Sequence, residues 1–228
     1  FSIVSHNICN ELVKKCGVVG YGISYDGTKR YPSSFYIYPA RRGFDFYSFD
    51  NLKMIIDREN PDVVVLFNDP HIIYNYIKRI AEIPNINMVP MFPINCFPPN
   101  EDIILNFSSV GIKDVIVYTE YSKSKVVEIN PNLNVHAVYH GTDRSLFKPI
   151  PETKKIHGID GLFVIGFVGT NTSRKRLDLT FEVFSKFSKD KENTRLLVHL
   201  GSKESAYSIP KLLNYYGVDG NKVILSDN

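Results

Sequence analysis

The sequence has few cysteines and no tryptophan. Its 228 residues include three cysteines, Cys9, Cys16 and Cys96, at irregular spacing. Three cysteines are too few for a disulfide framework, and none of them forms the CxxC pair that is typical of a metal site. A reducing compartment is the simplest interpretation, so we expect a cytoplasmic protein.

Long hydrophobic runs and an excess of one charge are absent as well. The longest apolar run, VVVLF at 63–67, is far shorter than the ~20 residues that a membrane-spanning helix needs. The chain carries 27 basic and 24 acidic residues, for a formal net charge of +3. This balance does not indicate a nucleic-acid-binding surface, so we expect no nucleic-acid partner and only a local basic site.

The residues that are present alternate between strand-like and helix-like patterns. A buried strand is predicted at 62–68, and helical and strand-like segments follow it in turn up to HGTD at 140–143. After a stretch rich in proline, glycine and lysine, the alternation begins again at Phe163. The pattern predicts an α/β protein with two Rossmann-like, doubly wound parallel-sheet domains. We place the domains at 1–148 and 161–228, with a linker at 149–160.

One junction in the second domain combines small polar and basic residues. The segment FVIGFVGTNTSRKRLDLTFEVF at 163–184 runs from a strand ending at Gly169 into a helical pattern. A helix N-terminus favours anions, and a cation placed there opposes the helix dipole. Arg174 and Lys175 therefore predict a bound anion, although a solvated basic turn before an ordinary helix is the alternative. The residues that could cap the helix or donate to phosphate are Thr170, Asn171, Thr172 and Ser173.

Several segments together resemble family 4 glycosyltransferases of the GT-B fold. In the second half they are VYHGTDRSLFKP at 138–149 and GFVGTNTSRKRLDLTFEVFSKF at 166–187. In the first half they are PDVVVLFND at 61–69, MFPINCFPP at 91–99 and VIVYTEYSKSKV at 115–126. The individual motifs are moderately specific, and their order along nearly the whole chain is more so.

The resemblance implies two domains that face a cleft and an enzyme that transfers a sugar from a nucleotide-diphosphate donor to a glycan, lipid or protein acceptor. It implies retention of anomeric configuration, no metal and no cofactor, in agreement with the absence of an Asp-x-Asp motif from the sequence. It places the donor diphosphate at Gly169, Thr170, Asn171, Arg174 and Lys175. It places Asp69, Asn95, Glu120, His140 and Gly141 at the cleft or the acceptor side.

The sequence also departs from the family pattern. The family's first strand, with its glycine-rich loop, and its late glutamate-rich segment have no counterpart, so we expect a fragment that is truncated at both ends. Asn95 stands where some relatives have aspartate, and Thr170 follows Gly169 where many have arginine. No catalytic residue is identified.

Other interpretations stay open at this point. A nucleotide-sugar epimerase or a phosphorylase uses the same fold, and a non-catalytic nucleotide-sugar-binding module is a third alternative. Asp69 is also interpreted as a cap on the helix that begins at Pro70, and Glu120 as part of a helix cap region. The aromatic segment at 31–49, with Arg41 and Arg42, suggests either membrane-surface contact or a loop packed on the first domain.

Overall fold

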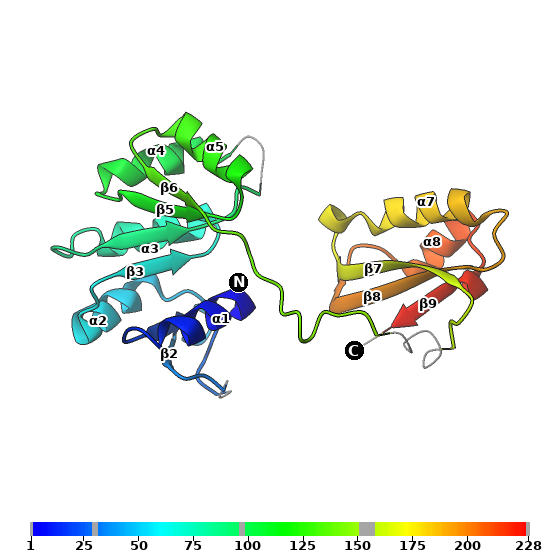
Figure 1. Cartoon of the computed structure of the whole chain (residues 1–228), viewed down its shortest axis with the longest axis horizontal. Helices are drawn as coiled ribbons and strands as arrows, with labels where there is room; N and C mark the ends of the chain where they lie inside the picture. Colours follow the sequence, from blue (N-terminus) through cyan, green and yellow to red (C-terminus); the bar gives the residue numbers. More distant parts are fainter. Residues whose placement is uncertain (1, 29–31, 96–98, 151–157, 227–228) are drawn as a thin grey trace. The chain divides into compact units, whose positions relative to one another are not determined.

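The computed structural model describes residues 2–28, 32–95, 99–150 and 158–226. The chain divides into two compact units, Phe1–Thr142 and Asp143–Asn228 (Figure 1). Each unit contains parallel strands connected by helices, so the predicted α/β class is confirmed. The proposed domain boundaries stay a prediction, and residues 151–157 of the proposed linker lie outside the described residues.

The first unit is built around a parallel sheet whose strands follow one another in sequence order, β3-β4-β5-β6. A separate pair of parallel strands, β1-β2, precedes it. The strands are β1 (Val19–Gly22), β2 (Tyr36–Pro39), β3 (Val64–Phe67), β4 (Met88–Met91), β5 (Asp114–Val117) and β6 (Asn134–Ala137). The helices are α1 (Ser2–Leu12), α2 (Phe49–Glu59), α3 (Pro70–Ile80), α4 (Glu101–Ser109) and α5 (Glu120–Ile129).

Helix α3 illustrates why these segments form their elements. Pro70 is its first residue, where the missing N–H of proline costs nothing. Ile73, Ile77 and Ile80 then recur at helical spacing, and each is at most 1% exposed. They join one core with buried residues of α4, α5 and the sheet. Burial of such a side chain contributes about 1.5–3 kcal/mol, which helps to hold α3 on the sheet.

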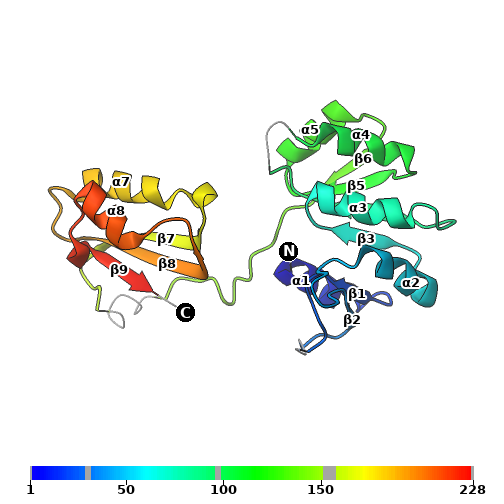
Figure 2. The ribbon, with the colours of Figure 1, turned by 180° about the vertical axis from the view of Figure 1, so that it is seen from behind.

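The second unit has a three-stranded parallel sheet in the order β7-β8-β9, seen from two sides in Figures 1 and 2. Its elements are β7 (Phe163–Asn171), the 3₁₀ turn η1 (Ser173–Lys175), α7 (Leu177–Ser188), β8 (Thr194–Ser205), α8 (Ile209–Tyr216), the 3₁₀ turn η2 (Gly220–Lys222) and β9 (Val223–Ser226). Leu196 and Val198 lie two residues apart on one face of β8. They pack with Phe181 and Phe184 of α7 to form the core of this unit.

No helix in the described part of the chain is long and apolar enough to cross a membrane.

Candidate functional site

The predicted anion site lies in a turn between β7 and α7, which we call the 172–176 turn. Two backbone hydrogen bonds close it, from Lys175 N to Thr172 O at 3.0 Å and from Arg176 N to Ser173 O at 3.1 Å. Helix α7 begins only at Leu177, and its N-cap is Arg176, which makes no side-chain cap bond. The interpretation that Thr170 to Ser173 cap this helix is therefore wrong, because β7 extends to Asn171, Ser173 belongs to the 3₁₀ turn, and Arg176 holds the N-cap position.

Strand β7 is longer than the sequence pattern predicts. It was expected to end at Gly169, but it continues through Thr170 to Asn171. A register shift between Gly169 and Asn171 lets the strand pair again with β8, with Asn171 opposite Ser205. Gly169 and Thr170 are therefore strand residues, and the turn that carries the cations starts after them.

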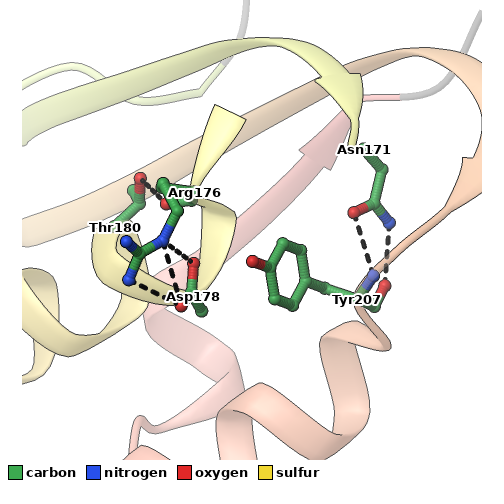
Figure 3. A network of polar contacts seen from close by, with 5 residues as sticks. All are labelled: Asn171, Arg176, Asp178, Thr180 and Tyr207. Carbon is green, nitrogen blue, oxygen red and sulfur yellow. Dashed lines mark hydrogen bonds and ion pairs between the residues drawn. The ribbon is translucent and has the colours of Figure 1, made fainter. Parts of the chain in front are cut away.

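Asn171 is buried, and both the nitrogen and the oxygen of its side-chain amide are hydrogen-bonded, as Figure 3 shows. Its Nδ2 donates to the carbonyl oxygen of Tyr207 at 2.8 Å, and the Tyr207 N–H donates to its Oδ1 at 3.2 Å. The carbonyl oxygen of Asn171 also accepts a bond of 2.9 Å from the N–H of Ala206. In this structure, the side chain of Asn171 joins the end of β7 to the segment before α8.

The three cations of the turn differ in their partners. Arg176 forms an ion pair with Asp178, with its Nε 3.0 Å from Oδ1 and its Nη2 3.1 Å from Oδ2 (Figure 3). Hydrogen bonding from Arg176 is the main cause that lowers the pKa of Asp178. Arg174 and Lys175 are exposed, and neither forms an ion pair with any residue that the structure describes. These two positive charges are available to an anionic ligand.

An apolar groove of about 430 Å³ extends from this turn along α7. Its cationic end is formed by Lys175 and Arg176. The remaining lining residues are Ile165, Leu179, Thr180, Val183, Phe184 and Phe187. An anionic group at the turn would therefore have an apolar surface beside it.

Among the residues predicted at the acceptor side, Asp69 and Asn95 lie together. Asp69 occupies the N-cap position of α3, but its side chain makes no cap bond. The carboxylate instead accepts a hydrogen bond of 3.0 Å from Nδ2 of Asn95. The predicted N-cap position of Asp69 is confirmed, but its carboxylate is bound by Asn95 and does not bond the first turn of α3.

His140 lies beside Tyr118. Its ring centroid is 4.2 Å from that of Tyr118, which follows β5. Glu120 is exposed at the start of α5, where Thr119 is the capping residue. Gly141 is exposed as well. The structure thus brings Asp69 to Asn95 and His140 to Tyr118, and the charge of Asp69 raises the pKa of Tyr118.

The aromatic segment at 31–49 contributes to both surface and packing. The side chain of Phe44 is 95% exposed, whereas Phe49 packs against the core of the first unit. The guanidinium of Arg41 lies 4.8 Å from the centre of the Phe46 ring. Contact with a membrane surface stays a prediction.

Tyr207 and Tyr118 belong to these groups of residues, although no motif pointed to them. Tyr207 is 36 residues from Asn171, and its role depends on a backbone contact that no residue pattern records. Within the described ranges, no group of three or more histidine, cysteine, aspartate or glutamate side chains could hold a metal ion.

No protein-family model matches the sequence, and no curated protein matches it. Sucrose-phosphate synthase from Thermosynechococcus elongatus is similar in structure, with a TM-score of 0.73 and 12% identity, over 99% of this chain and 64% of that one. HepE from Anabaena in complex with UDP has a TM-score of 0.60 and 11% identity, over 85% of this chain and 55% of that one.

A putative UDP-N-acetylglucosamine 2-epimerase from Listeria monocytogenes has a TM-score of 0.52 and 9% identity, over 85% of this chain and 54% of that one. The chain thus spans less than two thirds of the length of each of these structures. At such low identity the likeness concerns the fold alone. With its two units of parallel sheet and connecting helices, the chain has the fold of the GT-B proteins.

Proposed function

We propose that the chain is part of a glycosyltransferase that moves a sugar from a nucleotide-diphosphate donor to an acceptor. One observation carries this proposal: Arg174 and Lys175 are exposed and unpaired, among described residues, in a turn at the carboxyl end of a parallel strand. Ligands of open α/β sheets bind at this end of the strands. HepE, a structural neighbour, has been crystallised with UDP and with UDP-glucose, which supports a nucleotide-sugar donor.

The chemistry follows from the charge that develops on the donor. When the bond between the anomeric carbon and the diphosphate breaks, negative charge grows on the leaving group. Arg174 can bind this diphosphate through two N–H groups, and Lys175 adds a point charge. Donors that are already oriented stabilise the transition state without further reorganisation. Because the two side chains offset part of the negative charge of the leaving group, we propose a mechanism that uses no divalent ion.

The acceptor hydroxyl adds to the anomeric carbon, and the released diphosphate takes up its proton. We place the acceptor near Asp69, Asn95, Glu120, His140 and Gly141, and we propose retention of configuration. The placement of the acceptor and the retention of configuration both rest on the resemblance to family 4 glycosyltransferases. Gly169 and Thr170 are proposed to lie beside the diphosphate.

A titration with UDP tests the donor site. The double variant Arg174→Ala/Lys175→Ala should bind UDP at least tenfold more weakly, because each charge-assisted contact is worth about 1.5–3 kcal/mol and exposure reduces this value. Isothermal titration calorimetry would measure the affinity. Urea denaturation should show little change in stability, since both side chains are exposed.

A control variant separates local contacts from net charge. Lys189 and Lys211 are exposed and lie outside the 172–176 turn, so Lys189→Ala/Lys211→Ala removes the same charge. It should bind UDP as the wild-type chain does. Equal affinity of the Arg174→Ala/Lys175→Ala variant and the wild-type chain for UDP would refute the donor site.

An epimerase is the second candidate, because an epimerase is among the structural neighbours. The two activities differ in their products. A transferase releases UDP only as sugar is passed to an acceptor or to water, whereas an epimerase changes the configuration of the sugar. Incubation with UDP-glucose and UDP-N-acetylglucosamine, followed by product analysis, distinguishes them.

A further inference from the structure

Tyr207 contacts the chain on both sides of the 172–176 turn. It lies between β8 and α8, and its backbone forms two hydrogen bonds with the side chain of Asn171, the last residue before the turn. Figure 3 shows that its ring extends away from Asn171, with the hydroxyl on the side of Asp178. One residue from a distant part of the sequence thus reaches both ends of the turn.

The second contact is made through the hydroxyl of Tyr207. Figure 3 places this hydroxyl on the side of the Arg176–Asp178 pair, and both members of the pair affect the pKa of the phenol. Burial raises the pKa of Tyr207, and the bond to Asp178 raises it further. Because the phenol stays protonated at neutral pH, it can donate to the carboxylate of Asp178.

The contacts matter because the turn is held in an unfavourable conformation. Arg176 has a φ of 52°, in the left-handed region that side chains other than glycine rarely adopt. Such a conformation persists where surrounding contacts determine it. The ion pair with Asp178 holds the side chain of Arg176, and Asn171 fixes the chain at the other end. Arg174 and Lys175 project from the segment between these two attachments.

We propose that Tyr207 is a positioning residue, which holds the 172–176 turn so that Arg174 and Lys175 meet the two phosphates of the donor. This inference rests on the proposed function. Tyr207 acts through Asn171 on one side and through the Arg176–Asp178 pair on the other.

The test variant is Tyr207→Phe, which removes the hydroxyl and keeps the backbone bonds to Asn171. Tyr215→Phe is the matched control, because Tyr215 lies on α8 and is 81% exposed. Amide hydrogen exchange on the chain without ligand should be faster at Lys175 and Arg176, whose N–H groups close the turn. Exchange at Phe181 and Phe184 in the core should stay as in the wild type. A merely structural role would raise exchange throughout α7 instead.

The affinity for UDP and for pyrophosphate supplies the second measurement, since pyrophosphate reports the diphosphate contacts alone. Tyr207→Phe should weaken both by roughly threefold to tenfold, the effect of one hydrogen bond. In the background of Arg174→Ala/Lys175→Ala the same change should have no further effect. Such a non-additive effect would show that Tyr207 acts through Arg174 and Lys175.

Three results would overturn the inference. They are unchanged exchange at Lys175 and Arg176, unchanged affinity for both ligands, and a loss of affinity that adds fully to that of Arg174→Ala/Lys175→Ala. Failure of the proposed function appears differently, because Arg174→Ala/Lys175→Ala would then bind UDP normally while Tyr207 is intact.

Discussion

The rings of Tyr118 and His140 lie with their centroids 4.2 Å apart, and the hydroxyl of Tyr118 is buried with no hydrogen-bond partner among the described residues. Burial raises the pKa of this hydroxyl, and the charge of Asp69 adds to the effect. A buried polar group without a partner costs about 1–3 kcal/mol. Tyr76 offers a contrast in the same unit, because its hydroxyl donates to the carbonyl oxygen of Tyr47 at 2.6 Å.

The first prediction compares the two tyrosines. Tyr118→Phe should leave the free energy of unfolding unchanged or raise it by up to about 1 kcal/mol, because it removes an unpaired group. Tyr76→Phe should lower it by about 1 kcal/mol, because it removes a hydrogen bond. Urea denaturation followed by circular dichroism measures both. Similar losses in the two variants would mean that a buried water satisfies Tyr118.

Most of the fold was predictable because it depends on short-range patterns. The run VVLF of β3 and the isoleucines of α3 repeat at the spacings of a buried strand and an amphipathic helix. Pro70 and Gly217 mark a helix start and a helix end, the latter with a φ of 63°. Alternation of such elements then favours a parallel sheet.

The candidate site was only partly predictable, because its contacts join distant residues. The cationic turn was recognised from Arg174 and Lys175, which are adjacent in the sequence. The bonds between Asn171 and Tyr207 depend on how β7 and β8 pair, including a register shift that no residue pattern indicates. For the same reason the N-cap position of Asp69 was predictable, whereas the contact of its carboxylate with Asn95 was not.

The second prediction concerns the backbone at Arg176. Its φ of 52° suits glycine, and an alanine in the left-handed region costs about 1 kcal/mol more than glycine does. Both Arg176→Gly and Arg176→Ala remove the ion pair with Asp178, so the difference between them isolates the backbone conformation. We expect the glycine variant to be more stable by about 1 kcal/mol in thermal unfolding. Equal melting temperatures would argue against a strained residue.

The third prediction concerns the amide of Asn171. Replacement by alanine leaves the backbone N–H and carbonyl of Tyr207 without their partners, at a cost of about 1–3 kcal/mol. Asn171→Asp keeps an acceptor for the N–H but places a carboxylate against the carbonyl oxygen, so it should also destabilise. Asn193→Ala, at an exposed position before β8, is the control and should change stability little. Chemical denaturation of the three variants checks this order, and a wild-type-like Asn171→Ala would contradict it.

The last prediction concerns stability in acid. The carboxylate of Asp114 lies 3.1 Å from Nε2 of His136 and accepts a bond of 2.7 Å from Nδ2 of Asn134. The bond to His136, followed by that to Asn134, lowers the pKa of Asp114. A carboxyl group whose pKa is lower in the folded state binds protons more readily when the chain is unfolded. Its stabilising contribution is therefore complete above the unfolded pKa of about 4 and is lost as the pH falls through the folded pKa.

Asp114→Asn removes this contribution, so wild type and variant should differ in free energy of unfolding at neutral pH and converge below about pH 4. Urea denaturation at a series of pH values measures the difference. Asp62→Asn, at an exposed position before β3, is the control and should follow the wild-type curve. A gap between wild type and Asp114→Asn that stays constant down to the lowest pH would show that the two hydrogen bonds do not depend on the charge of Asp114.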